Sequence, residues 1–498
     1  MTAVLPSADD PVVAGAVEAV GGPPGRHALL DRPARLGRAG FWTPVRWVVA
    51  LTLLTSLLGF WQKAPCRVHP WADEYQYTRA CYTDVFALYF SEHLNEGKTP
   101  YAQYPVEYPV VIGAVMDVAA SAVRVFPVDE RPRRFYDVTW ALLTACAVVV
   151  AVTTARLAGR RRVWDAALFA AAPGLLLHGT TNWDLAAAAL AGLGLVQWAR
   201  RRPLAAGLLL GLATATKLYP VLFLVPLFAL CLRAGRLRAW AVTAGGLLLA
   251  ALAVTLPVYL TSPYFAERAG TSVVAASSVL DRVGSGGLAT LAPHLRTDRG
   301  DVAINPVYRF FELNTTRGAD WDSLWFQLQH YRGRPLDLGS GPPATLNRLV
   351  AVTFLVLLAG IVVLTLRAPR RPRLPQVLFL TMTAFLLSNK VFSPQYVIWL
   401  LPLAVLARPR WRPFLAWQAT EVAVMFARFY FFVGNDKSGQ GIDISWFFAA
   451  VLLRDAALVG YAALVVRDIL QPARDPVRAS TGEDDPAGGV LVSPATPP

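Results

Sequence analysis

One carboxylate in this sequence stands out because of its apolar surroundings. Asp84 lies in the run CYTDVFALYF, whose aromatic and aliphatic side chains would hold it at a membrane surface with little access to water. A carboxylate in such a setting is suited to act as a general base. The alternative is structural, since Asp is a favoured N-cap and Asp84 would cap a short helix over 85–96.

Two lysines lie at the ends of apolar stretches. Lys217 is part of TATKLYP and Lys390 is part of SNKVFSPQY. An ammonium group there must either snorkel to lipid headgroups or bind an anion. Snorkelling explains each lysine alone, but two lysines that each lie near Tyr and Pro favour a lipid phosphate as the anion. Glu107 lies where the chain enters an apolar stretch, and a carboxylate is costly there unless it is paired or functional.

Polar residues also occur between and within later apolar stretches. Asn182 and Asp184 form the tip between two of them, and the sequence leaves open whether Asp184 starts a helix or contacts a ligand. Arg428 lies seven residues after Glu421 on the same predicted helix face, which suggests an intramembrane ion pair. His178 receives no role from its context.

Composition indicates a membrane protein. Of the 498 residues, 55% are hydrophobic and 16% are charged, whereas soluble domains have about 25% charged residues. The net charge of +14 does not point to a nucleic-acid partner, because the basic residues form short clusters between apolar stretches rather than one basic face. Arginine clusters between apolar stretches mark cytoplasmic loops by the positive-inside rule.

The apolar stretches predict an all-α polytopic bundle of about 12–13 transmembrane helices. The N-terminus (1–41) is expected to be disordered and cytoplasmic, without a cleaved signal peptide, and the first span acts as a signal anchor. Because the arginine clusters place the C-terminus inside as well, one early segment cannot cross; 109–126 and the pair 204–217 and 218–232 are the candidates. The predicted spans are 42–62, 109–126, 136–158, 163–180, 183–199, 204–217, 218–232, 237–260, 346–367, 374–390, 393–407, 411–432 and 445–466.

Two long polar segments, 63–108 and 261–345, then fall on the outer side, within a membrane domain that spans 42–467. Cys66 and Cys81 share the first segment, where an oxidising environment favours a disulfide that closes a loop of some 15 residues. The tail (468–498) has no apolar periodicity and is expected to be disordered and cytoplasmic.

Several of these motifs together resemble glycosyltransferase family 87 of the GT-C superfamily, which includes polyprenol-phosphate-mannose-dependent mannosyltransferases. They occur in the order TDVFALY, GKTPY, VEYPV, TNWDLAAAAL, GLLLGLATATKLYP and NKVFSPQYVIWLLPL, and the resemblance runs from about residue 42 to residue 467.

The resemblance implies a GT-C-type bundle and transfer of a hexose, with mannose the first choice, from a polyprenyl-phosphate sugar. The acceptor is a lipid or glycan at the outer face of the plasma membrane, and the configuration at the anomeric carbon inverts. Asp84 is the implied base, although Asp73 and Glu74 share its loop. Lys217 and Lys390 are the implied phosphate ligands. The implied substrate contacts are Tyr101, Glu107, Tyr108, Asn182, Asp184, Gln395 and Arg428.

No cofactor is expected, because the lipid-linked sugar is a substrate, and no metal-ligand spacing of Cys or His occurs. The sequence leaves open whether a metal is needed and which oligomeric state the chain adopts. Two other functions would also fit a polytopic chain. A transporter or lipid flippase explains intramembrane charge but explains the long outer segments poorly. A membrane scaffold without chemistry leaves Glu107, Lys217 and Lys390 without a role.

Overall fold

The structure is a computed structural model that describes residues 10–13, 43–69, 74–268, 270–286, 291–297, 299–339, 341–436, 440–481 and 484–492. Within these residues, five helices are long and apolar enough to cross a membrane. They are α3 (Pro44–Val68), α7 (Arg131–Leu157), α13 (Leu237–Thr261), α17 (Ala344–Arg367) and α21 (Ile444–Leu470).

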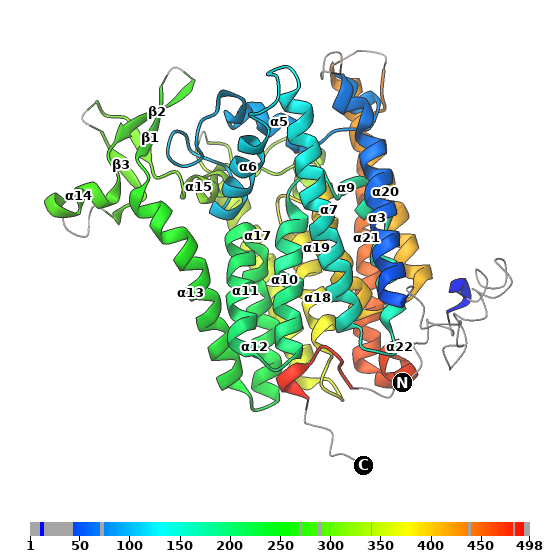
Figure 1. Ribbon diagram of the computed structural model, residues 1–498. Coiled ribbons are helices and arrows are strands. Elements are labelled where there is room, and N and C mark those ends of the chain that lie inside the picture. The colour runs from blue at the N-terminus through cyan, green and yellow to red at the C-terminus, as the bar shows by residue number, and fades with distance from the viewer. Residues whose placement is uncertain are drawn as a thin grey trace.

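Shorter apolar helices complete the bundle together with the long helix α20 (Trp411–Asp436) (Figure 1). The predicted all-α membrane fold is therefore confirmed, and most helix bounds agree with the predicted spans to within a few residues. The shorter helices are α6 (Val110–Ala122), α10 (Asp184–Ala199), α11 (Pro203–Thr216), η4 and α12 (Tyr219–Arg233), α18 (Leu374–Ser388), and η6 and α19 (Pro394–Ala407).

Two predicted spans differ from simple crossings. Segment 163–180 is not one helix but three short pieces, because Pro173 starts a new helix where its ring cannot continue the previous one. The pieces are η3 (Val163–Asp165), α8 (Ala166–Ala170) and α9 (Pro173–His178). Helix α6 has 13 residues, about 20 Å at 1.5 Å per residue, and lies in the upper layer beside α5 (Asp84–Ser91) (Figure 1).

Helix α11 is positioned by close packing on α13. A Cβ atom added to Gly207 would lie 2.2 Å from the Thr243 carbonyl oxygen, and one on Gly211 would lie 2.3 Å from the Leu247 carbonyl oxygen. Glycines four residues apart allow two helix backbones to approach closely, as in other membrane helix pairs. This contact fixes the C-terminal end of α11, from which Lys217 continues.

The outer segments form a layer above the bundle. The first contains α4 (Tyr75–Thr78), α5 and η2 (Leu94–Glu96), and a disulfide joins Cys66 to Cys81 with a Cα–Cα distance of 5.6 Å. The second contains a small antiparallel sheet of order β2-β1-β4-β3, which the all-α prediction did not include. Its elements are β1 (Tyr264–Arg268), β2 (Thr271–Ala276), α14 (Val279–Gly286), β3 (His294–Arg296), β4 (Val302–Ile304), α15 (Arg309–Thr316) and α16 (Leu324–Tyr331).

The C-terminal segment is ordered where the structure describes it, so the expectation of a disordered tail does not hold for 471–481 and 484–492. It forms η7 (Pro472–Arg474), α22 (Pro476–Thr481) and η8 (Gly489–Leu491). Asp475 is fully buried and accepts a 2.7 Å hydrogen bond from Arg373. The indole of Trp198 donates to the Gly488 carbonyl.

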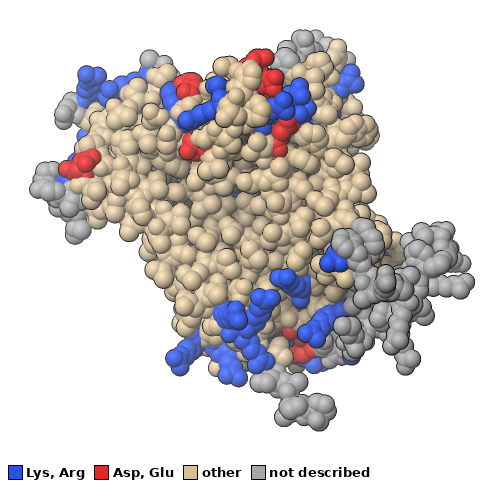
Figure 2. Space-filling model, viewed as in Figure 1, with Lys and Arg blue, Asp and Glu red and all other residues tan. Residues whose placement is uncertain are grey.

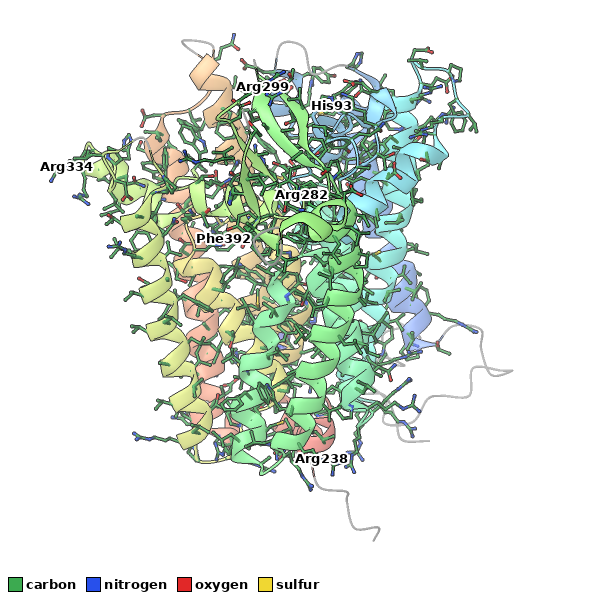
Figure 3. The ribbon with its side chains drawn as sticks, turned by 90° about the vertical axis from the view of Figure 1, so that its left-hand side faces the viewer. His93, Arg238, Arg282, Arg299, Arg334 and Phe392 are labelled. Carbon is green, nitrogen blue, oxygen red and sulfur yellow. A yellow bond between two sulfur atoms is a disulfide. The ribbon has the colours of Figure 1, made fainter. Side chains whose placement is uncertain are left out.

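Charge divides the molecule into zones (Figure 2). An uncharged band separates one end rich in Lys and Arg from the other end, where acidic and basic residues mix. In the rotated view, Arg238 marks the basic end, and Arg299 and Arg334 lie at the end that carries the outer layer (Figure 3). Such a band is expected where helices contact lipid.

Candidate active site

A cavity of about 720 Å³ lies between the outer layer and the bundle. It gathers residues from both outer segments and from the ends of α11 and α18, which are far apart in the sequence. Of the predicted site residues, those that line it are Asp84, Glu107, Tyr108, Asn182, Lys217, Lys390, Gln395 and Arg428.

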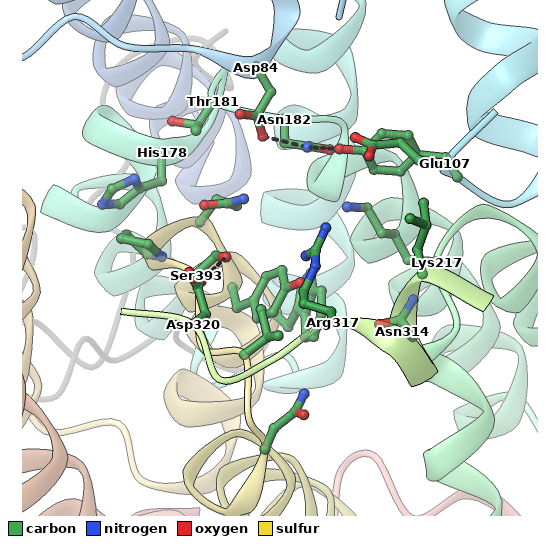
Figure 4. A pocket seen from close by; sticks show the side chains of 18 of the residues that line it. Asp84, Glu107, His178, Thr181, Asn182, Lys217, Asn314, Arg317, Asp320 and Ser393 are labelled. Carbon is green, nitrogen blue, oxygen red and sulfur yellow. Dashed lines mark hydrogen bonds between the residues drawn. The ribbon is translucent and has the colours of Figure 1, made fainter. Parts of the chain in front are cut away.

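Asp84 is held at the cavity wall by neighbours rather than by its own helix. Thr83 is the N-cap of α5, and its hydroxyl accepts from the Val85 amide, so the predicted capping role for Asp84 is wrong. The Asp84 carboxylate instead accepts hydrogen bonds from the Tyr82 hydroxyl at 2.8 Å and from the Asn182 amide at 2.7 Å. Figure 4 shows the Asp84–Asn182 contact at one side of the cavity.

Burial raises the pKa of Asp84, and the hydrogen bonds from Asn182 and Tyr82 act in the opposite direction. Glu107 lines the same cavity, and burial raises the pKa of its carboxyl too, while nearby Arg317 lowers it. The cavity therefore holds two carboxyl groups with increased basicity, which is the property that a general base needs.

Lys217 follows the end of α11 and has an acidic partner. Its ammonium lies 3.4 Å from the Asp184 carboxylate and 4.9 Å from the centre of the Tyr108 ring. Asp184 is the first residue of α10, is fully buried, and also accepts a 2.7 Å hydrogen bond from the Trp399 indole. Asp184 does not line the cavity. The structure therefore places it behind Lys217.

Lys390 lies between α18 and η6 and has only neutral partners among the described residues. Its ammonium donates to the Arg317 carbonyl and to the Asn347 amide oxygen, both at 2.6 Å. The Arg317 side chain lines the cavity as well (Figure 4). No carboxylate forms an ion pair with Lys390 or Arg317 in the part of the chain that the structure describes, so neither charge is neutralised by direct pairing.

Comparison with known proteins now identifies the family. A sequence profile described as glycosyltransferase family 87 matches residues 131–394, which is more than half of the chain. The chain belongs to glycosyltransferase family 87. The matched region includes Asn182, Lys217 and Lys390 and begins after Asp84.

No curated protein matches the chain. Among solved structures, this family 87 chain is similar to an oligosaccharyltransferase of Archaeoglobus fulgidus in its apo form, with 13% identity and a TM-score of 0.36, over 85% of this chain and 56% of that one. A second similar structure is the archaeal oligosaccharyltransferase AglB from Archaeoglobus fulgidus with an inhibitory peptide and a dolichol-phosphate. It has 13% identity and a TM-score of 0.38, over 86% of this chain and 56% of that one. The chain thus spans about half the length of these structures.

Two predicted contacts of the family 87 chain, Tyr101 and Arg428, have partners within the protein. Tyr101 does not line the cavity; it is buried and its hydroxyl donates to the Tyr108 carbonyl at 3.0 Å, so it supports Tyr108 from behind. Arg428 does line the cavity but forms an ion pair with Asp322. The predicted pair of Arg428 with Glu421 is therefore wrong, and Glu421 accepts from the Trp417 indole at 2.8 Å.

Sequence reasoning missed several cavity residues of this family 87 chain. Arg317 lies at the exposed end of α15, where no pattern distinguishes it from other surface arginines. Lys63 is buried in α3 and donates to the Tyr82 carbonyl at 2.8 Å, and its place directly after the first apolar stretch was the available signal. His178 is buried at the cavity wall, and its Nε2 atom has no hydrogen-bond partner among the described residues.

Glu74, which shares the first outer segment with Asp84, does not compete with it for the cavity. Glu74 is described but does not line it, and Asp73 lies outside the described residues. Among the described residues, no three His, Cys, Asp or Glu side chains are grouped so that they could hold a metal ion.

Proposed function

We propose that this chain transfers a hexose, with mannose the first choice, from a polyprenyl-phosphate sugar to a hydroxyl group of a lipid or glycan acceptor. The reaction takes place at the outer face of the plasma membrane, and the anomeric carbon inverts. One observation carries the proposal: half-buried Asp84 shares a cavity at the edge of the apolar bundle with Lys217, Lys390 and Arg317. Membership of the chain in a glycosyltransferase family supports the reaction class.

In the proposed reaction, the acceptor hydroxyl attacks the anomeric carbon from the face opposite the phosphate. The new carbon–oxygen bond forms while the bond to the phosphate oxygen breaks, and that oxygen keeps the electron pair. Asp84 accepts the hydroxyl proton. The raised pKa of Asp84 favours this step. The hydrogen bonds from Tyr82 and Asn182 fix the direction in which the carboxylate points.

Cations at the same cavity suit the leaving group. Negative charge builds up on the departing polyprenyl phosphate, and preplaced positive charges stabilise it most in a site with little water. Lys390 and Arg317 form no ion pair with an acidic side chain among the described residues, and both line the cavity, so their charges are available to the phosphate. Lys217 forms an ion pair with Asp184, so it stabilises the phosphate less than an unpaired cation would.

Apolar residues beside the cations suit the prenyl chain of the carrier. Leu218, Val350 and Phe385 line the same cavity as Lys217 and Lys390. Leu218 is 40% exposed. A prenyl chain leaving the cavity there would enter the hydrocarbon layer directly, while the phosphate stays with the cations.

The charge distribution supports the proposed orientation. The arginine-rich end in Figure 2 lies opposite the layer that contains the cavity, and basic ends of membrane proteins face the cytoplasm. Both described terminal regions then lie on the cytoplasmic side (Figure 1). Accessibility mapping of a single cysteine in the first outer segment tests this, and labelling from the cytoplasm would overturn the proposal.

The direct experiment is a transfer assay with the full chain in lipid nanodiscs. Polyprenyl phosphates that carry mannose, glucose, galactose or arabinose are each offered with lipid and glycan acceptors, and the anomeric configuration of the product is read by NMR. The proposal predicts transfer of one hexose with inversion. Transport of the intact lipid-linked sugar across the bilayer without any transfer would contradict it and favour a flippase.

A further inference from the structure

A second, smaller cavity opens next to the first on the outer side. It has a volume of about 240 Å³ and lies between the C-terminal end of α5, the loop before α6, the β1–β2 hairpin and the start of α15. Glu107 and Leu313 line both cavities, so they form the wall between the two. The two cavities are therefore neighbours, with Glu107 at their boundary.

The lining of the second cavity is polar and carries more acidic than basic groups. Glu92, Glu107 and Glu267 face a single guanidinium, Arg309, which forms a 2.7 Å ion pair with Glu312 outside the lining. The guanidinium in this lining is already paired with Glu312, so the cavity offers little free positive charge to a phosphate and does not suit the donor. Carboxylates, a guanidinium and hydroxyl groups are instead the groups that bind the closely spaced hydroxyls of a sugar ring.

Tyr104 adds a group that lacks a partner. It lines the second cavity, is only 3% exposed, and its hydroxyl has no hydrogen-bond partner among the described residues. A buried hydroxyl left without a partner costs roughly 1–3 kcal/mol. A ligand that offers a hydrogen bond there would remove this cost.

The other polar groups are held in place by the fold. Glu92 is 5% exposed, and its carboxyl accepts from the Glu107 amide at 3.3 Å. On the opposite side, the Ser272 hydroxyl donates to Glu267 at 2.6 Å across the β1–β2 hairpin. His93 lies near the outer end of the molecule in Figure 3 and completes the lining. The rim is open to solvent, because Glu267 is exposed.

From this geometry we infer that the second cavity is a sugar subsite for the acceptor, so that the chain acts on acceptors that carry at least two hexose units. The reacting unit lies in the main cavity near Asp84, and the preceding unit lies beyond Glu107. The second cavity is smaller than the pockets of roughly 300–1,000 Å³ that hold drug-sized ligands. Its volume therefore suits a single sugar ring. The inference rests on the proposed transferase function, because it assigns the substrate of that same site.

The test compares octyl glycosides with one or two hexose units, in manno, gluco and galacto configurations, as acceptors for the full chain in nanodiscs. The wild type should prefer the best two-unit acceptor at least tenfold in kcat/KM. In Tyr104→Phe and in Glu267→Gln this preference should fall to within about twofold of parity, mainly through KM. Tyr104→Phe removes an unpartnered hydroxyl, so its melting temperature should equal or exceed that of the wild type.

Matched controls are Tyr331→Phe, an exposed tyrosine on α16, and Glu130→Gln, since neither residue lines either cavity. Both should keep the wild-type preference. Equal use of one-unit and two-unit acceptors by the wild type would overturn the inference while the transferase function stands.

If the wild type transfers a sugar to none of the acceptors, the proposed transferase function is wrong. The sugar subsite is then tested separately, by direct binding. Free disaccharides should then give saturation-transfer NMR signals with the wild type that Tyr104→Phe and Glu267→Gln lose. Signals that are unchanged in both variants would reject the subsite.

Discussion

The Lys217 ammonium lies 3.4 Å from the buried carboxylate of Asp184, so one of the cavity's cations is held by an acid that does not itself line the cavity. The two residues come from different elements, since Lys217 follows α11 and Asp184 begins α10. The pair therefore links the position of a cation in the cavity to the packing of two helices.

Replacing Lys217 with Met should have two effects that can be separated. Loss of one partner leaves Asp184 buried and unpaired, which costs about 3–5 kcal/mol of folding stability, and the affinity for the donor also falls. The double variant Lys217→Met with Asp184→Asn should regain most of the stability but not the donor affinity. Thermal unfolding and donor KM measure the two effects, and Lys98→Met, in an exposed ion pair, is the control. Recovery of donor affinity in the double variant would contradict a phosphate role for Lys217.

The membrane bundle could be predicted well from the sequence because apolar stretches of helix length fix where helices lie. The site was harder to predict because its parts come from separate elements. Asp84, Asn182, Lys217 and Lys390 could be selected, since each is a polar group in an apolar context. Arg317 could not, because its place depends on how α15 lies over the bundle.

The errors also have physical causes. Arg428 and Glu421 share a helix face, but seven residues place them about 10 Å apart along the axis. Asp322, from the second outer segment, comes within pairing distance of Arg428 instead. The tail was expected to be disordered because it lacks apolar periodicity, yet its acidic residues find arginine partners such as Arg373, and that pairing leaves no periodic signal.

Lys390 should control donor binding in a way that depends on pH. Burial lowers the pKa of Lys390 to about 8, so its charge is present below that pH and is lost as the pH rises through it. Lys390→Met should raise the donor KM by roughly 10–100-fold at pH 7, the range expected when a charged hydrogen bond is lost. Lys390→Arg keeps its charge at high pH, so its donor KM should rise less than that of the wild type between pH 7 and 9. If donor KM changes with pH in the same way in Lys390→Arg and in the wild type, the charge of Lys390 does not control donor binding.

Glu92 should make folding stability depend on pH. Burial and the neighbouring Glu107 raise the pKa of Glu92 from 4.5 to about 8. The folded state therefore binds the proton more tightly than the unfolded state, and stability falls as the pH rises from about 4.5 to 8 and then levels off. Glu92→Gln removes this pH-dependent loss of folding stability, which amounts to at most about 1.4 kcal/mol for each unit of pKa shift. Its melting temperature should exceed that of the wild type at pH 9 and approach it at pH 5, and a constant difference across this range would be inconsistent with the assignment.

The C-terminal segment should stabilise the cytoplasmic end. Arg373 is 1% exposed and pairs with Asp475, so a chain that ends after Gln471 leaves a buried guanidinium without its partner. Truncation there, or Asp475→Asn alone, should cost about 3–5 kcal/mol in thermal unfolding. Truncation after Val492 removes none of the described contacts and serves as the control. Equal melting temperatures for both truncations would mean that the pairing contributes little.

The most direct measurement of the central claim is the turnover of Asp84→Asn with saturating donor and acceptor. The variant keeps the shape of the side chain but loses the base, so kcat should fall by about 10²–10⁴-fold, while donor KM and melting temperature stay close to those of the wild type. Glu107→Gln, the matched change at another carboxyl that lines the cavity, should lower kcat far less. An Asp84→Asn variant that keeps wild-type turnover, or a Glu107→Gln variant that alone loses it, would contradict Asp84 as the base.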